Sequence, residues 1–303
     1  MPFKLRAFLP SKQREVQISE LTYKQYRELV KSLHSTDKEE SIQQYNSILA
    51  DLCSDIKDID ITFEDKLFLL FTVRNYCVSP DLKLKITTVD KNVFNYSLPV
   101  EEVLKRLKNV NKSGKAVYQD IEVSFSSYKA RDEYDFIGNN KDTMLILASY
   151  IDTIKILDKI TTFKDLTLKD RRQIVEAFPF ALLKKLQQEI SKIEDKYQQQ
   201  DLILINNPYN NTPALKLTQN ITYDSLQKLI NFGFTEELNN VYRAFYNIVR
   251  YAGFNPDYVD RITPIEMQVY WMYFMEDSKK ESAETSKVNA LQLPNSPDAK
   301  LGF

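Results

Sequence analysis

Four residue types are scarce in this chain of 303 residues, which has 5 glycines, 1 histidine, 2 cysteines and 1 tryptophan. Glycine averages about 7% of residues in proteins, so roughly three quarters of the expected glycines are absent. No two glycines have the spacing that G-x-G-x-x-G, a Walker A loop or a nucleophile elbow requires. The sequence therefore excludes nucleotide binding through those glycine-rich loops.

The few histidine and cysteine residues exclude several kinds of metal and redox site. His34 alone cannot supply a three-histidine zinc site, an H-E-x-x-H motif or the zinc deaminase signature. Cys53 and Cys77 form no C-x-x-C motif, and their number does not indicate a secreted disulfide framework. We expect an exposed His34 at a helix end, two small core cysteines, a reducing compartment and no cofactor.

Charge and hydropathy limit the possible partners. Lys and Arg number 41 against 42 Asp and Glu, and this net charge of −1 argues against non-specific nucleic-acid binding. The apolar runs at 67–73 and 144–151 are far shorter than the roughly 20 residues of a membrane span. The N-terminus also lacks the apolar run of a signal peptide. We expect a soluble protein that stays in the cell that makes it.

The first part of the chain, residues 1–110, predicts a small α+β module with hairpins. Alternating apolar residues predict strands at 5–9, 16–18, 82–88 and 93–98. Capping boxes predict helix starts at Thr22 with Gln25, at Ser41 with Gln44, and at Thr62 with Asp65. The helix after Thr62 is nearly all apolar in its second half, so we place it at the centre of the core. Pro99 is expected as the first residue of a short helix.

The rest of the chain predicts a connection, a mainly helical part and a tail. Residues 111–140 form the connection and contain a strand or hairpin, because Ile121, Val123 and Phe125 alternate with polar residues. Residues 141–281 form the mainly helical domain, with a hairpin over 201–218. The expected helices cover 144–156, 167–176, 179–193, 222–232 and 235–251, and a further one starts at Thr263-Pro264. Residues 282–303 lack periodicity and predict a flexible tail.

Two glycines are predicted to end helices of this second part. Gly233 and Gly253 each follow an apolar helical repeat, where a left-handed backbone conformation is common. The whole pattern therefore predicts an α+β fold, with strands concentrated before residue 140 and helices after it.

Acidic residues offer the main route to catalysis in this sequence. The candidates are Asp132, Glu133 and Asp135 beside Arg131, together with Glu64 and Asp65 at a helix start. Paired carboxylates serve glycosidases, so a cell-wall hydrolase is one hypothesis. However, the helix dipole explains the pair at the helix start, and a solvated loop explains the run at 131–135. We therefore predict that the protein is not an enzyme.

The most unusual segment is IEMQVYWMYFM at residues 265–275. A helix that is apolar all round is either central to a core or shared with a partner. Core burial alone is the simpler explanation, and the alternative places one face in the core and one on a partner. Aromatic and methionine residues are enriched at interface hot spots. The partner-binding candidates are Tyr270, Trp271, Tyr273 and Phe274, with Leu301 and Phe303 of the tail.

Four segments have a recognisable order: FLPSKQREVQISELTYKQYRELVKSL, FEDKLFLLFTVRNYCVSP, DLTLKDRRQIVEAFPFALLKKLQQEI, and LINFGFTEELNNVYRAFYNIVRYAGF followed by DRITPIEMQVYWMYFMED. In order and spacing they resemble the baseplate hub protein family of T-even-type contractile-tailed bacteriophages, across most of residues 1–280. One departure is that paired cysteines, expected near the two hairpins in some relatives, are absent from 86–95 and 201–217. No metal site and no catalytic residue is therefore carried over from the family.

The resemblance implies a structural or assembly role at the centre of a tail baseplate. The first hypothesis is a non-enzymatic virion component that binds other hub and baseplate proteins through helices and strand edges. Such a protein would be found in the host cytoplasm during assembly and then in the baseplate. The second hypothesis is an assembly chaperone absent from the mature virion, and the third is the carboxylate-based hydrolase. Oligomeric state, copy number and host remain open.

Overall fold

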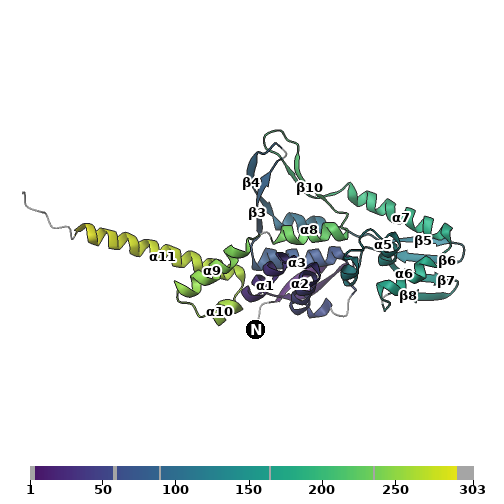
Figure 1. Cartoon of the computed structure of the whole chain (residues 1–303), viewed down its shortest axis with the longest axis horizontal. Helices are drawn as coiled ribbons and strands as arrows, with labels where there is room; N and C mark the ends of the chain where they lie inside the picture. The colour runs from purple at the N-terminus through teal and green to yellow at the C-terminus, as the bar shows by residue number, and fades with distance from the viewer. Residues whose placement is uncertain (1–3, 57–59, 89, 164, 235, 292–303) are drawn as a thin grey trace, which may run out of the picture.

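The structure is a computed structural model that describes residues 4–56, 60–88, 90–163, 165–234 and 236–291. The molecule is elongated, with a central body of helices, a sheet with helices at one end, and the long helix α11 (Pro264–Leu291) projecting at the other (Figure 1). Helices and antiparallel sheets are both present, and helices dominate the C-terminal part. The predicted α+β class is confirmed.

The body begins with a hairpin and three helices. They are β1 (Lys4–Leu9), β2 (Arg14–Ser19), α1 (Tyr23–Leu33), α2 (Lys38–Leu52) and α3 (Phe63–Cys77), with the short 3₁₀ turn η1 (Ser54–Ile56) before α3. The capping boxes at Thr22 and Thr62 are confirmed. Residues 63–74 are all buried, which confirms the central place of α3 in the core.

The predicted start of the second helix is wrong. Helix α2 begins at Lys38, and the Asp37 side chain accepts hydrogen bonds from the N–H groups of Glu39 and Glu40. A carboxylate at this position satisfies two free backbone donors and favours the positive end of the helix dipole. Ser41 lies inside the helix and is buried.

Two further hairpins rise from the same side of the body (Figure 1). They are β3 (Asp81–Thr87) with β4 (Val93–Pro99), and β9 (Asp201–Asn206) with β10 (Pro213–Thr218), and both are confirmed predictions. Pro99 ends β4 and caps α4 (Val100–Leu107), so it lies just before the first helical residue and not at it. The Arg106 guanidinium donates to the carbonyl of Leu202 at 3.0 Å, which ties α4 to β9.

A four-stranded antiparallel sheet forms the end of the molecule opposite α11 (Figure 1). Its order is β5 (Gly114–Tyr118), β6 (Ile121–Phe125), β7 (Ile151–Ile156) and β8 (Lys159–Thr162), and its helices are η2 (Ala130–Phe136), α5 (Thr143–Tyr150), α6 (Leu168–Glu176) and α7 (Phe180–Gln198). The hairpin predicted in 111–140 is confirmed. The single helix predicted over 144–156 is wrong, since it divides into α5 and β7. The β-branched residues after Tyr150 pair with β6, as Ile154 does with Val123.

The C-terminal part consists of α8 (Tyr223–Gly233), α9 (Leu238–Arg250), α10 (Pro256–Arg261) and α11. Gly253 has φ +71°, which confirms its predicted left-handed conformation. The same prediction is wrong for Gly233, which is the last residue of α8. A Cβ atom there would lie 3.2 Å from Phe71 Cζ, so this glycine allows α8 to pack closely on α3. Helix α11 also includes residues 282–291 of the expected flexible tail, while 292–303 lie outside the described residues.

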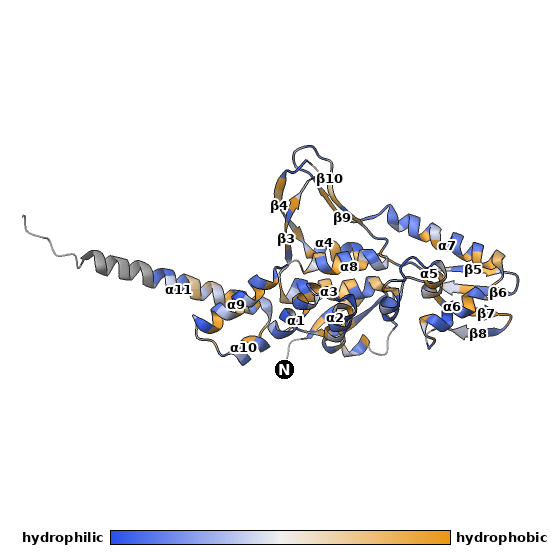
Figure 2. Ribbon diagram, in the orientation of Figure 1, coloured by the Kyte–Doolittle hydropathy of each residue, from blue (hydrophilic) through white to orange (hydrophobic). Residues whose placement is uncertain are grey.

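Buried apolar side chains form one cluster that extends from β1 to the first turns of α11. Figure 2 shows hydrophobic residues gathered where the helices of the body face one another. Cys53 and Cys77 are free and buried in this cluster, as predicted, and His34 is exposed at the end of α1. The division into domains stays a prediction, although the four-stranded sheet joins strands from both sides of residue 140.

Candidate functional site

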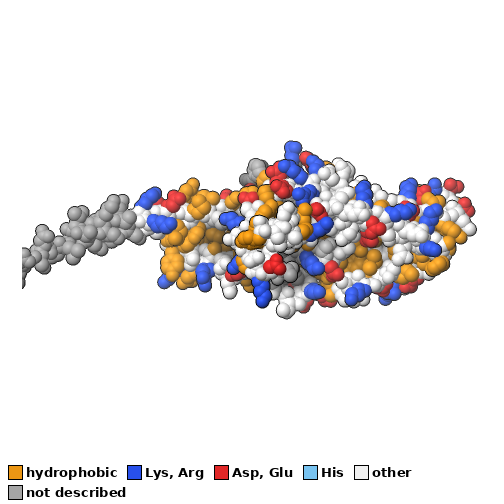
Figure 3. All heavy atoms as spheres, turned by 90° about the horizontal axis from the view of Figure 1, so that it is seen from above, with side chains coloured by type: hydrophobic (Ala, Val, Ile, Leu, Met, Phe, Trp, Pro, Cys, Tyr) orange, Lys and Arg blue, Asp and Glu red, His pale blue; other side chains and the backbone are white. Residues whose placement is uncertain are grey.

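Exposed aromatic and methionine side chains gather on α9, α10 and α11 and just after the end of α9. They are Tyr242, Tyr246, Tyr251, Tyr258, Met272, Tyr273 and Met275, each between 39% and 63% exposed. We call this set the aromatic surface. Figure 3 shows hydrophobic side chains clustered where α11 leaves the body. Exposed apolar side chains that gather in one region mark interaction sites on soluble proteins.

Contacts between the three helices hold the aromatic surface in place. The ring of Tyr270 packs 5.3 Å from Phe254, and its hydroxyl lies 3.2 Å from that of Tyr258. Trp271 stacks on Phe274 with ring centroids 5.3 Å apart. The contacts of Tyr270 connect α11 to the α9–α10 turn and to α10, and the Trp271–Phe274 contact lies within α11. The exposed rings therefore project from a packed base.

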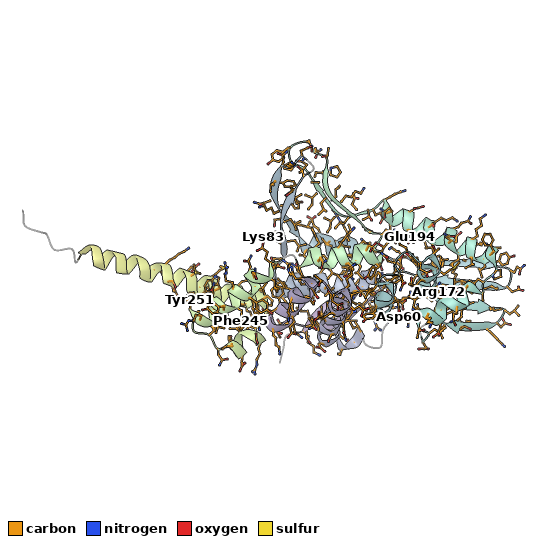
Figure 4. The ribbon with its side chains drawn as sticks, in the orientation of Figure 1. Asp60, Lys83, Arg172, Glu194, Phe245 and Tyr251 are labelled. Carbon is orange, nitrogen blue, oxygen red and sulfur yellow. The ribbon has the colours of Figure 1, made fainter. Side chains whose placement is uncertain are left out.

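Helices α9 and α10 are fixed to the body through α1. The Tyr23 hydroxyl donates to the carbonyl of Val241 at 2.8 Å. The Arg27 guanidinium lies 3.8 Å from the centroid of the Phe245 ring and also pairs with Asp260. Figure 4 shows that Tyr251 lies farther toward α11 than Phe245. Val241 and Ile248 of α9 are buried, whereas Tyr242 and Tyr246 are exposed, so one side of α9 anchors the helix and its other side remains available.

The structure separates the predicted partner-binding residues into three groups. Tyr273 is 59% exposed, whereas Tyr270, Trp271 and Phe274 are half-buried in the contacts that support it. Leu301 and Phe303 lie outside the described residues. Their role in partner binding stays a prediction.

Core burial alone is a wrong explanation for residues 265–275. Within this segment, Met267 is the residue that reaches the core, at 4% exposure. Met272 and Met275 are exposed, and α11 contacts the body through its first turns before it projects outward (Figure 1). A helix that leaves the body cannot bury all its sides within the same chain, which favours the alternative that one face meets a partner.

The acidic run at 131–135 does not form the solvated loop that the sequence predicted. Glu133 is fully buried and accepts hydrogen bonds from the Tyr45 hydroxyl, the Lys66 ammonium and the Gln227 amide. Asp132 is 2% exposed and pairs with the guanidinium of Arg171 on α6. Both carboxylates are thus held by donors from other elements of the fold.

Burial shifts the pKa values of this cluster. It raises the pKa of the Asp132 carboxyl, and the charge of Arg171 opposes that shift. It also lowers the pKa of the Lys66 ammonium, and the charge of Glu133 opposes that shift. Asp135 is on the surface, so the three acids of the run do not share one site. The buried ion pair and hydrogen bonds of Asp132 and Glu133 explain why these acids are present, without a role in glycoside hydrolysis.

The two acids at the start of α3 are also buried. Asp65 accepts from the N–H groups of Thr62 at 2.9 Å and of Ser11 at 2.8 Å, so it completes the predicted cap. Glu64 lies 3.1 Å from the Lys112 ammonium, and both side chains are at most 2% exposed. The helix dipole explains Asp65, but Glu64 also has a charge partner that the sequence did not indicate.

Comparison with known proteins places these features in a family. One family model, described as T4 bacteriophage base plate protein, matches residues 1–206, which is more than half of the chain. The chain belongs to this baseplate protein family. No curated protein and no solved structure matches it. This match confirms the predicted resemblance to the baseplate proteins of T4-type phages.

The matched range covers most of the body and the four-stranded sheet of this baseplate protein. The aromatic surface lies beyond it, on α9 to α11. Family membership therefore assigns the molecule to the tail baseplate, whereas the residues of the aromatic surface must be understood from their own chemistry.

A polar crevice of about 450 Å³ lies between the body and the sheet of the baseplate protein. Its charged lining residues are Lys12, Asp60, Lys112, Arg131 and Asp152. Most of these charges already have partners, since Asp152 pairs with Lys129 at 2.6 Å and Arg131 pairs with Asp60 at 3.4 Å.

In the described ranges, no group of three or more His, Cys, Asp and Glu residues could hold a metal ion. No helix within those ranges is long and apolar enough to cross a bilayer.

The sequence prediction missed the contribution of α9 to the aromatic surface. Tyr242, Tyr246 and Tyr251 belong to the segment 235–251, for which the sequence predicts a helix and no exposed aromatic face. The available signal was tyrosines on the polar side of the helical repeat, where charged residues are usual. The baseplate protein thus presents two neighbouring aromatic helices, and the sequence indicated one.

Proposed function

We propose that this baseplate protein is a non-enzymatic structural component of the tail baseplate hub. It acts by binding neighbouring hub and baseplate proteins, first in the host cytoplasm during assembly and then in the virion. The observation that supports this proposal most directly is the exposed aromatic surface on helices that project from a well-packed body (Figures 1 and 3).

The physical basis of binding would be apolar and shape complementarity. Tyrosine and methionine are enriched in the buried centres of protein interfaces. Tyrosine supplies a large, rigid contact area at a low entropic cost, and the flexible methionine side chain adapts to the shape of the partner. Helix α11 has 28 residues and is therefore about 40 Å long, long enough to cross much of a neighbouring subunit. A partner that covers these rings would remove their apolar surface from water.

Mass spectrometry of purified virions tests the proposal. The wild-type protein is expected in mature particles, and the Tyr251→Ala/Tyr273→Ala protein is expected to be lost from them. The matched control is Tyr76→Ala/Tyr209→Ala, because these tyrosines are also exposed but lie away from the aromatic surface, on α3 and in the loop between β9 and β10. The control protein should be incorporated as the wild type is.

Two results would change the proposal. If the wild-type protein is present in assembly intermediates and absent from mature virions, it is an assembly chaperone. If the purified protein lyses cell walls, the non-enzymatic part of the proposal is wrong, and Asp132, Glu133 and Asp135 must be re-examined by substitution with alanine.

A further inference from the structure

Helix α9 has one outward face with an unusual composition. Its exposed side chains are Asn239, Tyr242, Arg243, Tyr246 and Arg250. Their spacing of three, four and seven residues places them on a single side of the helix. Val241 and Ile248 are buried on the opposite side. The outward face is therefore continuous and is not interrupted by the residues that anchor α9 to the body.

The two arginines of this face have no charge partner. Arg243 and Arg250 make no ion pair with any side chain in the described part of the chain, and α9 contains no Asp or Glu. Elsewhere in the molecule, by contrast, Arg74 pairs with Glu236 at 2.6 Å and Arg171 pairs with Asp132. The outward face of α9 thus has two uncompensated positive charges on a molecule whose net charge is −1.

We infer that the outward face of α9 binds an acidic helical segment of a partner protein. Carboxylates of the partner pair with Arg243 and Arg250, and its apolar side chains cover Tyr242 and Tyr246. The guanidinium groups can each bind a carboxylate through two parallel hydrogen bonds. Because the arginines are seven residues apart, acidic residues two turns apart on the partner helix would match them. This inference rests on the proposed function, and it adds the chemistry of the partner.

The charge pattern favours a protein over a nucleic acid. Binding to DNA or RNA depends on neutralising many phosphates with Lys and Arg, and the chain as a whole is slightly acidic. Two arginines flanked by tyrosines fit a compact interface, where these two residue types are frequent hot spots.

Binding measurements with purified proteins test the inference. Full-length protein is titrated separately with each purified baseplate and hub protein of the same phage, at 50 and 300 mM NaCl. We expect one of these proteins to bind the wild type, less tightly at the higher salt concentration. The Arg243→Glu/Arg250→Glu protein should bind it at least about tenfold more weakly. The matched control is Arg14→Glu, because Arg14 is exposed on β2 and should leave binding unchanged.

Three outcomes overturn the inference. They are equal binding by the wild type and the double variant, no arginine-dependent binding to any of the purified proteins, and arginine-dependent binding to a 30-nucleotide single strand only. Both arginines are exposed, so the double variant should stay folded at the temperature of the titrations. Its unfolding temperature should fall only slightly, because Arg250 lies in the last turn of α9 where a positive charge is favourable. Thermal unfolding therefore separates lost binding from lost folding.

Virion composition separates this inference from the proposed function. If the Arg243→Glu/Arg250→Glu protein enters virions normally while the Tyr251→Ala/Tyr273→Ala protein does not, the acidic partner is wrong and the structural role stands. If the wild-type protein itself is absent from virions, the structural role fails, and the titrations still decide whether α9 binds an acidic partner.

Discussion

Away from the C-terminal helices, Arg171 is fully buried and pairs with Asp132, whereas Arg243 on α9 is exposed and has no ion pair with a described side chain. Tyrosines differ in the same way. Tyr45 is fully buried and donates to Glu133, whereas Tyr246 is 55% exposed. The same residue types thus serve internal packing in one region and remain available to partners in the other.

This difference in burial shows which region of the molecule is held in place by contacts within the chain. Removing charges from water is costly, so a buried ion pair is maintained only when the surrounding geometry supplies the complementary groups. The body and the sheet end together meet this condition through Lys66, Glu133, Asp132 and Arg171. Helices α9 and α11 leave several tyrosine, methionine and arginine side chains exposed, which is the expected property of a surface that a partner covers.

The largest expected effect concerns the buried pair of Lys66 and Glu133. Lys66→Met leaves the Glu133 carboxylate buried without its countercharge, so the free energy of unfolding should fall by about 3–5 kcal/mol. Urea denaturation at pH 7 measures this change. The matched control is Lys105→Met, which removes a surface ion pair with Glu101 and should cost less than about 0.5 kcal/mol. A similar small cost at Lys66 would contradict the tightly paired body.

A smaller effect is expected when one hydroxyl is removed from each region. Tyr45→Phe removes a hydrogen bond to the charged Glu133 and should destabilise the fold by about 1.5–3 kcal/mol. Tyr246→Phe changes an exposed side chain and should alter stability by less than about 0.5 kcal/mol. Parallel denaturation curves compare the two proteins. Equal losses would show that the α9 tyrosine is also part of the folded core.

Thiol reactivity should distinguish the two regions without changing stability. Burial raises the pKa of Cys77 to about 11 and also raises the pKa of Cys53, so neither thiol should be reactive at pH 8. A thiol introduced by Tyr251→Cys should react at the rate of a free thiol, at least about 100-fold faster. A disulfide reagent such as DTNB measures both rates. Fast reaction of the native cysteines would show that the body opens readily.

Much of the secondary structure could be predicted because its signals are local. The Thr62 capping box and the alternation in β3 depend on residues within a few positions of each other. Local signals failed where two structures were equally compatible with them. The apolar residues of 144–156 suited a helix, and the division into α5 and β7 depends on pairing with β6, some 30 positions earlier.

The candidate site was less predictable because its determinants are distant in the sequence. Glu133 and its partner Lys66 are 67 positions apart, and Asp132 and Arg171 are 39 apart, so nothing near 131–135 indicated burial. The aromatic composition of 265–275 was visible, but whether the rings face a core depends on where α11 leaves the body. The exposed tyrosines of α9 were overlooked for the same reason.

The central claim is that the aromatic surface attaches this protein to the baseplate. The most direct test counts its copies per virion by quantitative mass spectrometry, for Tyr251→Ala/Tyr273→Ala and for Tyr76→Ala/Tyr209→Ala, with thermal unfolding of both proteins measured beside it. We predict similar unfolding temperatures, wild-type copy number for the second protein and loss of the first from the particle. Wild-type incorporation of Tyr251→Ala/Tyr273→Ala would contradict the claim.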